Sequence, residues 1–289
     1  MNIKSLEKTF GVSQYPNINF GLKELPQQAR DMSGKVSISG VQPKLLVKFD
    51  KRKNLLVRDD DGEYILKPQV LYPVPYSNIP ENEQCCMDIA AEIGIDVPAH
   101  CLIPLKDESL AYVVKRFDRK KGDKIHQEDF FQVLGPKDKY IGSVEQIGRK
   151  LKEISSVPGL DVQLFFERII FYFLIGNGDA HFKNYSIACY DDGQIRLTPA
   201  YDIVCTKLVV PEDSDSALKI NGANDKLKRK DFDSLADYFH IPLKVRYDKF
   251  AGKFKLMEAM ICSSMLDKDK QKEFVKIINE RYQRLDLTG

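Results

Sequence analysis

The stretch that decides the fold reads L-F-F-E-R-I-I-F-Y-F-L-I over Leu164–Ile175 and G-N-G-D-A-H-F-K-N over Gly176–Asn184. The first part is a nearly unbroken apolar run, which is typical of a helix buried in a core. It carries Glu167 and Arg168, and it is shorter than the roughly 20 apolar residues that span a bilayer. The sequence therefore predicts a polar, glycine-rich loop that a buried helix holds in place.

This loop gathers polar side chains suited to phosphoryl transfer. Asp179 precedes Asn184 by five positions, which is the spacing of the catalytic Asp and metal-binding Asn of protein kinases. One carboxylate must accept the proton of the attacking hydroxyl, and a nearby oxygen must hold Mg²⁺ on the phosphates. We predict Asp179 as the catalytic base and Asn184 as a metal ligand. The plainer interpretation is a polar loop that caps a helix.

A second carboxylate follows at the expected distance along the chain. Residues 185–190 and 194–198 flank a D-D-G turn, which predicts a hairpin, and P-A-Y-D ends at Asp202. In kinases an Asp beyond such a hairpin binds Mg²⁺, so Asp202 is the second predicted metal ligand. Ile203 and Val204 stand where kinases carry Phe-Gly.

Lys67 ends a predicted strand that reads E-Y-I-L-K. It resembles the V-A-I-K lysine, which neutralises the α- and β-phosphates of ATP and pairs with a helical Glu. Glu81 and Glu83 of the next predicted helix are both candidates for that partner. The plainer alternatives are a solvated lysine at a strand end and a Glu that favours the helix dipole.

The segment S-I-S-G-V-Q-P-K, from Ser37 to Lys44, precedes the first predicted strand. Backbone N–H groups of such a loop could cradle phosphates, although an ordinary turn is an equal interpretation. Two serines lie beside this cradle, so we expect phosphorylation of Ser37 or Ser39 to repel ATP. Further on, Ala111–Phe117 leads into the connection between the lobes, where the hinge of a kinase contacts adenine. Phe117 could supply apolar surface for the ring, and a place in the core is an equal interpretation.

The periodicity predicts an α+β fold of two lobes, with an N-lobe over residues 1–117 and a helical C-lobe over residues 118–289. Strands are expected at 44–49, 54–58, 63–67, 101–104 and 111–117, with a helix at 80–93. Further helices are expected at 143–154, 162–175, 232–239, 245–263 and 271–285. Residues 118–124 are expected to form a polar connection.

Composition excludes several classes of protein. With 44 basic and 42 acidic residues the net charge is +2, which argues against a dedicated nucleic-acid binder. The six cysteines form no C-x-x-C pair, so we expect no zinc site but reduced thiols in a cytosolic protein. The N-terminus shows no charged-then-apolar signal. We therefore expect neither a membrane nor nucleic acid as a direct partner.

Taken together, these segments resemble a known family, the HipA toxin kinases of bacterial toxin–antitoxin systems. The matching segments follow in family order and cover most of the chain. They are S-I-S-G-V-Q-P-K-L (37–45), Y-I-L-K-P (64–68), Asn82-Glu83, V-K-R-F-D-R (114–119), G-N-G-D-A-H-F-K-N-Y-S (176–186), L-T-P-A-Y-D (197–202) and A-L-K-I-N-G (217–222).

The resemblance implies a kinase-like fold, a cytoplasmic location and serine/threonine protein kinase activity with Mg-ATP. It implies an aminoacyl-tRNA synthetase as protein substrate, a HipB-like DNA-binding antitoxin as partner, and autophosphorylation on Ser37 or Ser39. The implied ATP-binding residues are Ser39, Gly40, Val41, Gln42, Pro43, Lys44, Lys67, Lys115, Arg116, Phe117, His181, Phe182, Lys183, Asn184, Tyr201 and Asp202.

One departure from the family pattern concerns the N-terminal side. Full-length members carry an additional small subdomain before the S-x-S loop, whereas here 36 residues precede Ser37. The chain therefore resembles the shortened HipT type, in which a separate small HipS-like protein takes the place of that subdomain.

Two other functions are compatible with the sequence. A metal-dependent hydrolase could use Asp179, His181 and Asp202 as ligands, but it would leave Lys67 and the S-I-S-G loop without a role. A catalytically silent binding module is the second alternative. The complete set of Lys67, Asp179, Asn184 and Asp202 argues against it.

Overall fold

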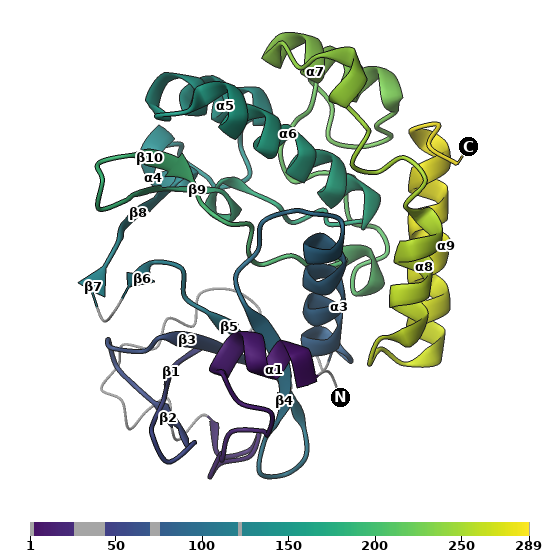
Figure 1. The fold of residues 1–289 in the computed structure, drawn as a ribbon. Helices are drawn as coiled ribbons and strands as arrows, with labels where there is room; N and C mark the ends of the chain where they lie inside the picture. The colour runs from purple at the N-terminus through teal and green to yellow at the C-terminus, as the bar shows by residue number, and fades with distance from the viewer. Residues whose placement is uncertain (1–2, 26–43, 70–75, 121–122, 289) are drawn as a thin grey trace. The chain divides into compact units, whose positions relative to one another are not determined.

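The computed structural model describes residues 3–25, 44–69, 76–120 and 123–288. The chain forms two compact units (Figure 1). The first comprises residues 1–84 and 98–124, and the second residues 85–97 and 125–289. The first is rich in strands and the second in helices. The predicted division between residues 117 and 118 stays a prediction.

A five-stranded antiparallel sheet forms the core of the first unit, in the order β2-β1-β3-β5-β4. Its strands are β1 (Leu45–Phe49), β2 (Leu55–Val57), β3 (Tyr64–Pro68), β4 (His100–Pro104) and β5 (Leu110–Lys115). All five lie where the sequence predicts strands. Alternate side chains such as Leu45 and Val47 are buried, as expected for a sheet with one covered face.

Helix α1 (Ile3–Phe10) contributes to that apolar core through Leu6 and Phe10. The ring of Phe10 lies 4.9 Å from that of Tyr64 in β3. A short antiparallel pair, β6 (Arg119–Lys120) and β7 (Asp123–Lys124), occupies the stretch predicted as a polar connection.

Helix α3 (Ile79–Glu92) confirms the helix predicted at residues 80–93. Pro80 lies in its first turn, where the missing N–H costs nothing. Beyond its end Gly94 adopts φ +83°, a left-handed conformation that glycine adopts without strain. The boundary between the two units falls inside this helix.

The second unit is built around helix α6 (Pro158–Leu174), whose residues from Phe165 onward are all buried. Helix α5 (Val144–Ile154) packs beside it (Figure 1). The other helices are α4 (Phe130–Leu134), α7 (Arg229–Phe239), α8 (Phe254–Ser263) and α9 (Lys268–Arg284), with 3-10 turns at Phe182–Asn184, Thr206–Leu208 and Leu243–Val245.

A three-stranded antiparallel sheet of order β10-β9-β8 completes this unit. The predicted hairpin is present as β9 (Ser186–Cys189) and β10 (Ile195–Leu197). The third strand, β8 (His126–Asp129), was not predicted from the sequence. Its polar H-Q-E-D sequence carries no strand signal, and its pairing with β9 is non-local.

The single helix predicted at residues 245–263 is wrong. The structure has a short 3-10 turn ending at Val245 and starts α8 only at Phe254. Gly252 adopts φ +68° between them, a conformation that ends a helix rather than continuing it.

Two further expectations concern the whole chain. All six cysteines are free, and four of them are buried, as predicted. Within the described part of the chain, every helix is too short or too polar to cross a bilayer.

Candidate active site

In the first unit, Lys67 and Glu83 form a buried ion pair. The Lys67 ammonium lies 2.5 Å from Oε1 of Glu83, and the two side chains are 4% and 1% exposed. The strand β3 presents the lysine and the first turns of α3 present the glutamate. Of the two candidate partners the structure therefore selects Glu83. Burying two charges costs free energy unless the charges pair closely. The ion pair therefore fixes the positions of both side chains.

The predicted hinge lies at the end of β5 in the same unit. The N–H of Lys115 donates to the carbonyl of Ala99, and that of Arg116 to the carbonyl of Glu63. The Arg116 guanidinium donates two hydrogen bonds, of 2.9 and 2.7 Å, to the Asp118 carboxylate. Arg116 is thus anchored within the unit, and nucleotide binding by Lys115, Arg116 and Phe117 stays a prediction.

The predicted phosphate loop is outside the described residues from Ser37 to Pro43, including Ser39, Gly40, Val41 and Gln42. Lys44 is described and half-buried, and it directly precedes β1. The assignments of this loop to ATP binding and autophosphorylation therefore stay predictions.

In the second unit, sterics explain two glycines of the predicted catalytic loop, Gly176–Asn184, which is called the catalytic loop below. Gly176 follows the end of α6 with φ +71°, which suits glycine. At Gly178 a Cβ would overlap the Asp213 carboxylate and the Ser214 carbonyl. The Gly178 N–H donates to the Thr206 hydroxyl at 2.8 Å. Only glycine allows the chain to turn here against the segment that follows Asp202.

Asp179 is exposed at the tip of this loop, where it can meet an incoming hydroxyl. The Tyr140 hydroxyl donates a hydrogen bond of 2.8 Å to its Oδ1. Partial burial and this bond to a carboxylate raise the pKa of Tyr140 above its ordinary value, so the phenol stays a donor at neutral pH. Sequence reasoning missed Tyr140, since it lies 39 residues away in an unpatterned loop.

His181 is a buried, neutral member of the site. Burial lowers its pKa, and so does the Lys139 ammonium, while the carboxylates of Asp179 and Asp202 act in the opposite direction. The Lys139 ammonium lies 2.7 Å from Nε2 of His181, so this nitrogen accepts a hydrogen bond. The carboxylates of Asp179 and Asp202 thus both lie close enough to the His181 imidazole to influence its pKa.

Asn184 and Asp202 provide the oxygen atoms expected of metal ligands. The Asn184 amide oxygen accepts from the His181 N–H at 3.1 Å, which fixes its orientation. Asp202 adopts φ +56°, a strained conformation for a non-glycine residue and one that clusters at functional sites. The preceding Tyr201 donates its hydroxyl to the carbonyl of Lys183 at 2.9 Å, tying Asp202 to the catalytic loop.

An amide oxygen and a carboxylate suit Mg²⁺, which prefers hard oxygen ligands. They do not suit the transition metal of a hydrolase. Nε2 of His181 faces an ammonium, and the described residues contain no group of three His, Cys, Asp or Glu side chains that could hold a metal. The geometry therefore gives the hydrolase alternative no support.

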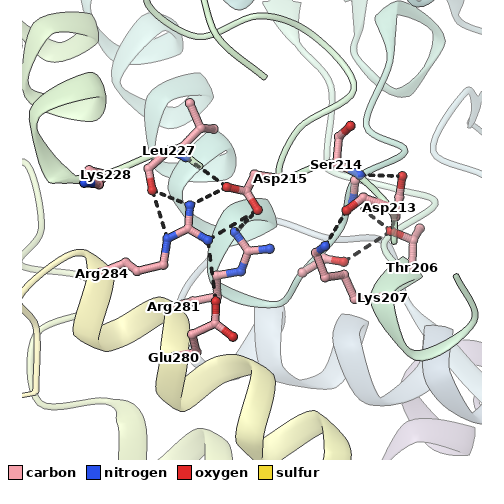
Figure 2. A network of polar contacts seen from close by, with 12 residues as sticks. Thr206, Lys207, Asp213, Ser214, Asp215, Leu227, Lys228, Glu280, Arg281 and Arg284 are labelled. Carbon is pink, nitrogen blue, oxygen red and sulfur yellow. Dashed lines mark hydrogen bonds and ion pairs between the residues drawn. The ribbon is translucent and has the colours of Figure 1, made fainter. Parts of the chain in front are cut away.

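Polar contacts fix the segment that follows Asp202 (Figure 2). Thr206 bonds to the Asp213 carboxylate, and Lys207 donates to the Asp213 carbonyl. Asp215 is buried between two arginines of α9, with Arg281 at 2.5 Å and Arg284 in a bidentate contact. Helix α9 thus fixes the segment around Asp215, and this segment in turn supports the catalytic loop.

Comparison with known sequences identifies relatives over most of this region. A Y4dM protein of Sinorhizobium fredii, named as a candidate kinase, is 36% identical over 212 residues, covering 67% of this chain and 51% of its own. A candidate kinase of Haemophilus influenzae is 34% identical over 214 residues, covering 65% and 58%. The chain spans about half the length of these relatives.

Two solved structures share the fold. HipA of Shewanella oneidensis, from a toxin–antitoxin complex of HipA, HipB and operator DNA, aligns with a TM-score of 0.71 and 20% identity, over 93% of this chain and 72% of its own. The Helicobacter pylori proinflammatory kinase CtkA aligns with a TM-score of 0.60 and 17% identity, over 88% and 92%. The predicted α+β, kinase-like fold is thereby confirmed.

A family profile gives the assignment itself. The profile of the HipA-like C-terminal domain matches residues 36–278, which include both the Lys67–Glu83 pair and the catalytic loop. This protein belongs to the family of HipA-like C-terminal domains.

Proposed function

We propose that this chain is an ATP-dependent protein kinase that phosphorylates serine or threonine hydroxyls. The buried ion pair of Lys67 and Glu83 carries the proposal. Protein kinases require a lysine of the third strand paired with a glutamate of the following helix, and here β3 and α3 supply them. A hydrolase would have no use for this pair.

The catalytic loop supplies the residue that moves the proton. The acceptor hydroxyl oxygen forms a bond to the γ-phosphorus while the bond from that phosphorus to the bridging oxygen of ADP breaks. Asp179 accepts the hydroxyl proton, and ADP leaves. Since Oδ1 of Asp179 accepts from Tyr140, we assign the proton to Oδ2.

Other residues hold the nucleotide. The Lys67 ammonium offsets charge on the α- and β-phosphates, and the oxygens of Asn184 and Asp202 would hold Mg²⁺. When bound, the metal neutralises the β- and γ-phosphate oxygens. His181, neutral and held by Lys139, keeps Asn184 in place through its backbone N–H.

The biological role follows from the family. We propose that the chain is the toxin of a toxin–antitoxin pair, with a HipB-like antitoxin as partner, because its solved relative lies in a complex with HipB and operator DNA. An aminoacyl-tRNA synthetase as substrate, autophosphorylation on Ser37 or Ser39 and a separate HipS-like protein rest on the family resemblance alone.

Phosphate incorporation tests the proposal. The purified chain is incubated with Mg²⁺, ATP labelled on the γ-phosphate and a bacterial lysate, beside an Asp179→Asn chain. We expect label on serine or threonine of a lysate protein, identified by mass spectrometry, and on Ser37 or Ser39 of the chain itself. The absence of any protein-bound label that depends on Asp179 would refute kinase activity.

A further inference from the structure

The unit that carries the catalytic loop also contains an open groove of about 640 Å³ at the N-terminal end of α5. Its lining includes Tyr140, Ile141, Glu145, Arg149, Lys219 and Tyr238. We name it the Tyr140 groove. Nothing in the binding of ATP or Mg²⁺ accounts for these residues.

The Tyr140 groove begins at the reacting carboxylate. Tyr140 itself bonds to Asp179, and the adjacent carbonyl of Lys139 accepts from the Phe182 N–H of the catalytic loop at 3.2 Å. A Cβ at Gly142 would overlap the Phe182 ring, so the floor of the groove rests directly on the loop. A chain whose hydroxyl reaches Asp179 would therefore have this groove beside it.

The opposite wall uses a family segment that nucleotide chemistry leaves unexplained, A-L-K-I-N-G at residues 217–222. Lys219 forms a parallel bridge with Ser143, through bonds from its N–H to the Gly142 carbonyl and from the Val144 N–H to its own carbonyl. These bonds fix Lys219 against the start of α5. The groove is thus a built feature and not a gap between loops.

The chemistry of the lining is apolar and basic. Tyr140, Ile141 and Tyr238 are 45%, 71% and 48% exposed and line the same groove, and exposed apolar side chains that lie together mark a binding surface more than single ones do. Arg149 and Lys219 have no carboxylate partner among the residues that the structure describes. The one acid of the lining, Glu145, accepts from the Asn221 N–H at 2.7 Å.

We propose that the Tyr140 groove binds the polypeptide that flanks the acceptor hydroxyl, and that it selects an apolar and an acidic side chain there. Ile141 and Tyr238 supply the apolar surface, while Arg149 and Lys219 supply the complementary charge. Continuity with Asp179 favours a polypeptide over a separate small molecule. The inference rests on the proposed kinase function and adds the sequence preference of its protein substrate.

Peptide binding tests this inference separately from phosphoryl transfer. The probes are arrayed nine-residue peptides with a central serine, in which each flanking position is varied through glutamate, lysine, leucine and glycine. The full chain is applied with Mg²⁺ and a non-hydrolysable ATP analogue. Its variants are Arg149→Glu with Lys219→Glu, Ile141→Asp, and the control Lys152→Glu, which alters an exposed lysine of the same helix outside the groove.

The wild-type chain and the Lys152→Glu control should prefer glutamate-containing peptides to lysine-containing ones by roughly fivefold, as expected for two exposed charge pairs. The double charge reversal should invert that preference, and Ile141→Asp should remove the preference for leucine. No peptide binding, or a preference unchanged by charge reversal, would overturn the inference. Nucleotide affinity is measured for the wild-type chain and its three variants. Equal values show that the nucleotide site is intact, so a changed peptide preference cannot come from failure of the kinase site.

Discussion

The hydroxyl of Tyr140 donates a hydrogen bond of 2.8 Å to Oδ1 of Asp179, the residue assigned as the catalytic base. The Tyr140 ring also packs edge-on against His181 at 5.1 Å. Two contacts therefore hold the phenol in place, and the phenol in turn orients the carboxylate.

Tyr140→Phe should lower kcat by roughly threefold to tenfold, as expected for a lost hydrogen bond to a charged, exposed group, while nucleotide affinity stays unchanged. The ring keeps its packing and only the hydroxyl is lost. Steady-state kinetics beside titration with Mg-ATP measures both quantities. Tyr190→Phe, at a half-buried tyrosine of the β9–β10 hairpin outside the groove, is the matched control. A similar fall in kcat in that variant would contradict a specific role of Tyr140.

Variants of the Lys67–Glu83 pair should distinguish its effect on stability from its effect on activity. Lys67→Met alone leaves Glu83 buried without its cation, so we expect a loss of about 3–5 kcal/mol in the free energy of unfolding and loss of activity. The double variant Lys67→Met with Glu83→Leu should recover most of that stability, because no charge remains buried, and should stay inactive. Urea unfolding and phosphate incorporation measure the two effects. An active double variant would show that the pair is only structural.

Asn184→Ala and Asp202→Ala should weaken Mg-ATP binding far more than the binding of Mg-free ATP, since each removes an oxygen ligand from a hard cation. Asp202 should matter more because it brings a full charge. Calorimetry with and without Mg²⁺ gives the comparison. Equal losses under both conditions would exclude a metal role for either residue.

Asp215 gives a prediction of pH dependence. Burial alone would raise its pKa, but hydrogen bonding from Arg284 and the charges of Arg281 and Arg284 lower it below 3.8 overall. A carboxyl whose pKa is lowered by folding stabilises the protein above its unfolded pKa and loses that contribution as the pH falls through the folded value.

Asp215→Asn should therefore destabilise the chain at pH 7, by about 3–5 kcal/mol, because Arg281 stays buried without its anion. The difference from wild type should shrink as the pH falls below 3.8, the ordinary pKa of the group. Denaturant unfolding from pH 7 down to pH 3 checks this, with Asp225→Asn, an exposed aspartate, as control. A difference that does not change with pH would contradict the assignment.

The sequence predicts those parts of the site that depend on short spacings. Asp179 and Asn184 lie five positions apart in one loop, so the buried helix and the glycines were enough to indicate their place. Lys67 was predicted together with two possible partners. The choice of Glu83 depends on how α3 is positioned against β3, which the order of residues alone does not determine.

Contacts between distant segments were not predictable. Lys139 and Tyr140 meet His181 and Asp179 only after the chain has folded across about 40 positions. The polar strand β8 likewise exists because β9 pairs with it. Helix α4 was not predicted either, although Asp129 and Gln132 form a capping box at its start, a pattern that marks helix beginnings.

The most direct test of the central claim is the rate of phosphoryl transfer by Asp179→Asn, measured together with its affinity for Mg-ATP. The amide keeps the shape of the side chain and its hydrogen bond from Tyr140 but cannot accept the hydroxyl proton. We predict a fall in kcat of roughly 10²–10⁴-fold with Mg-ATP affinity within about twofold of wild type. Near-normal turnover in this variant would contradict the assignment of Asp179 as the catalytic base.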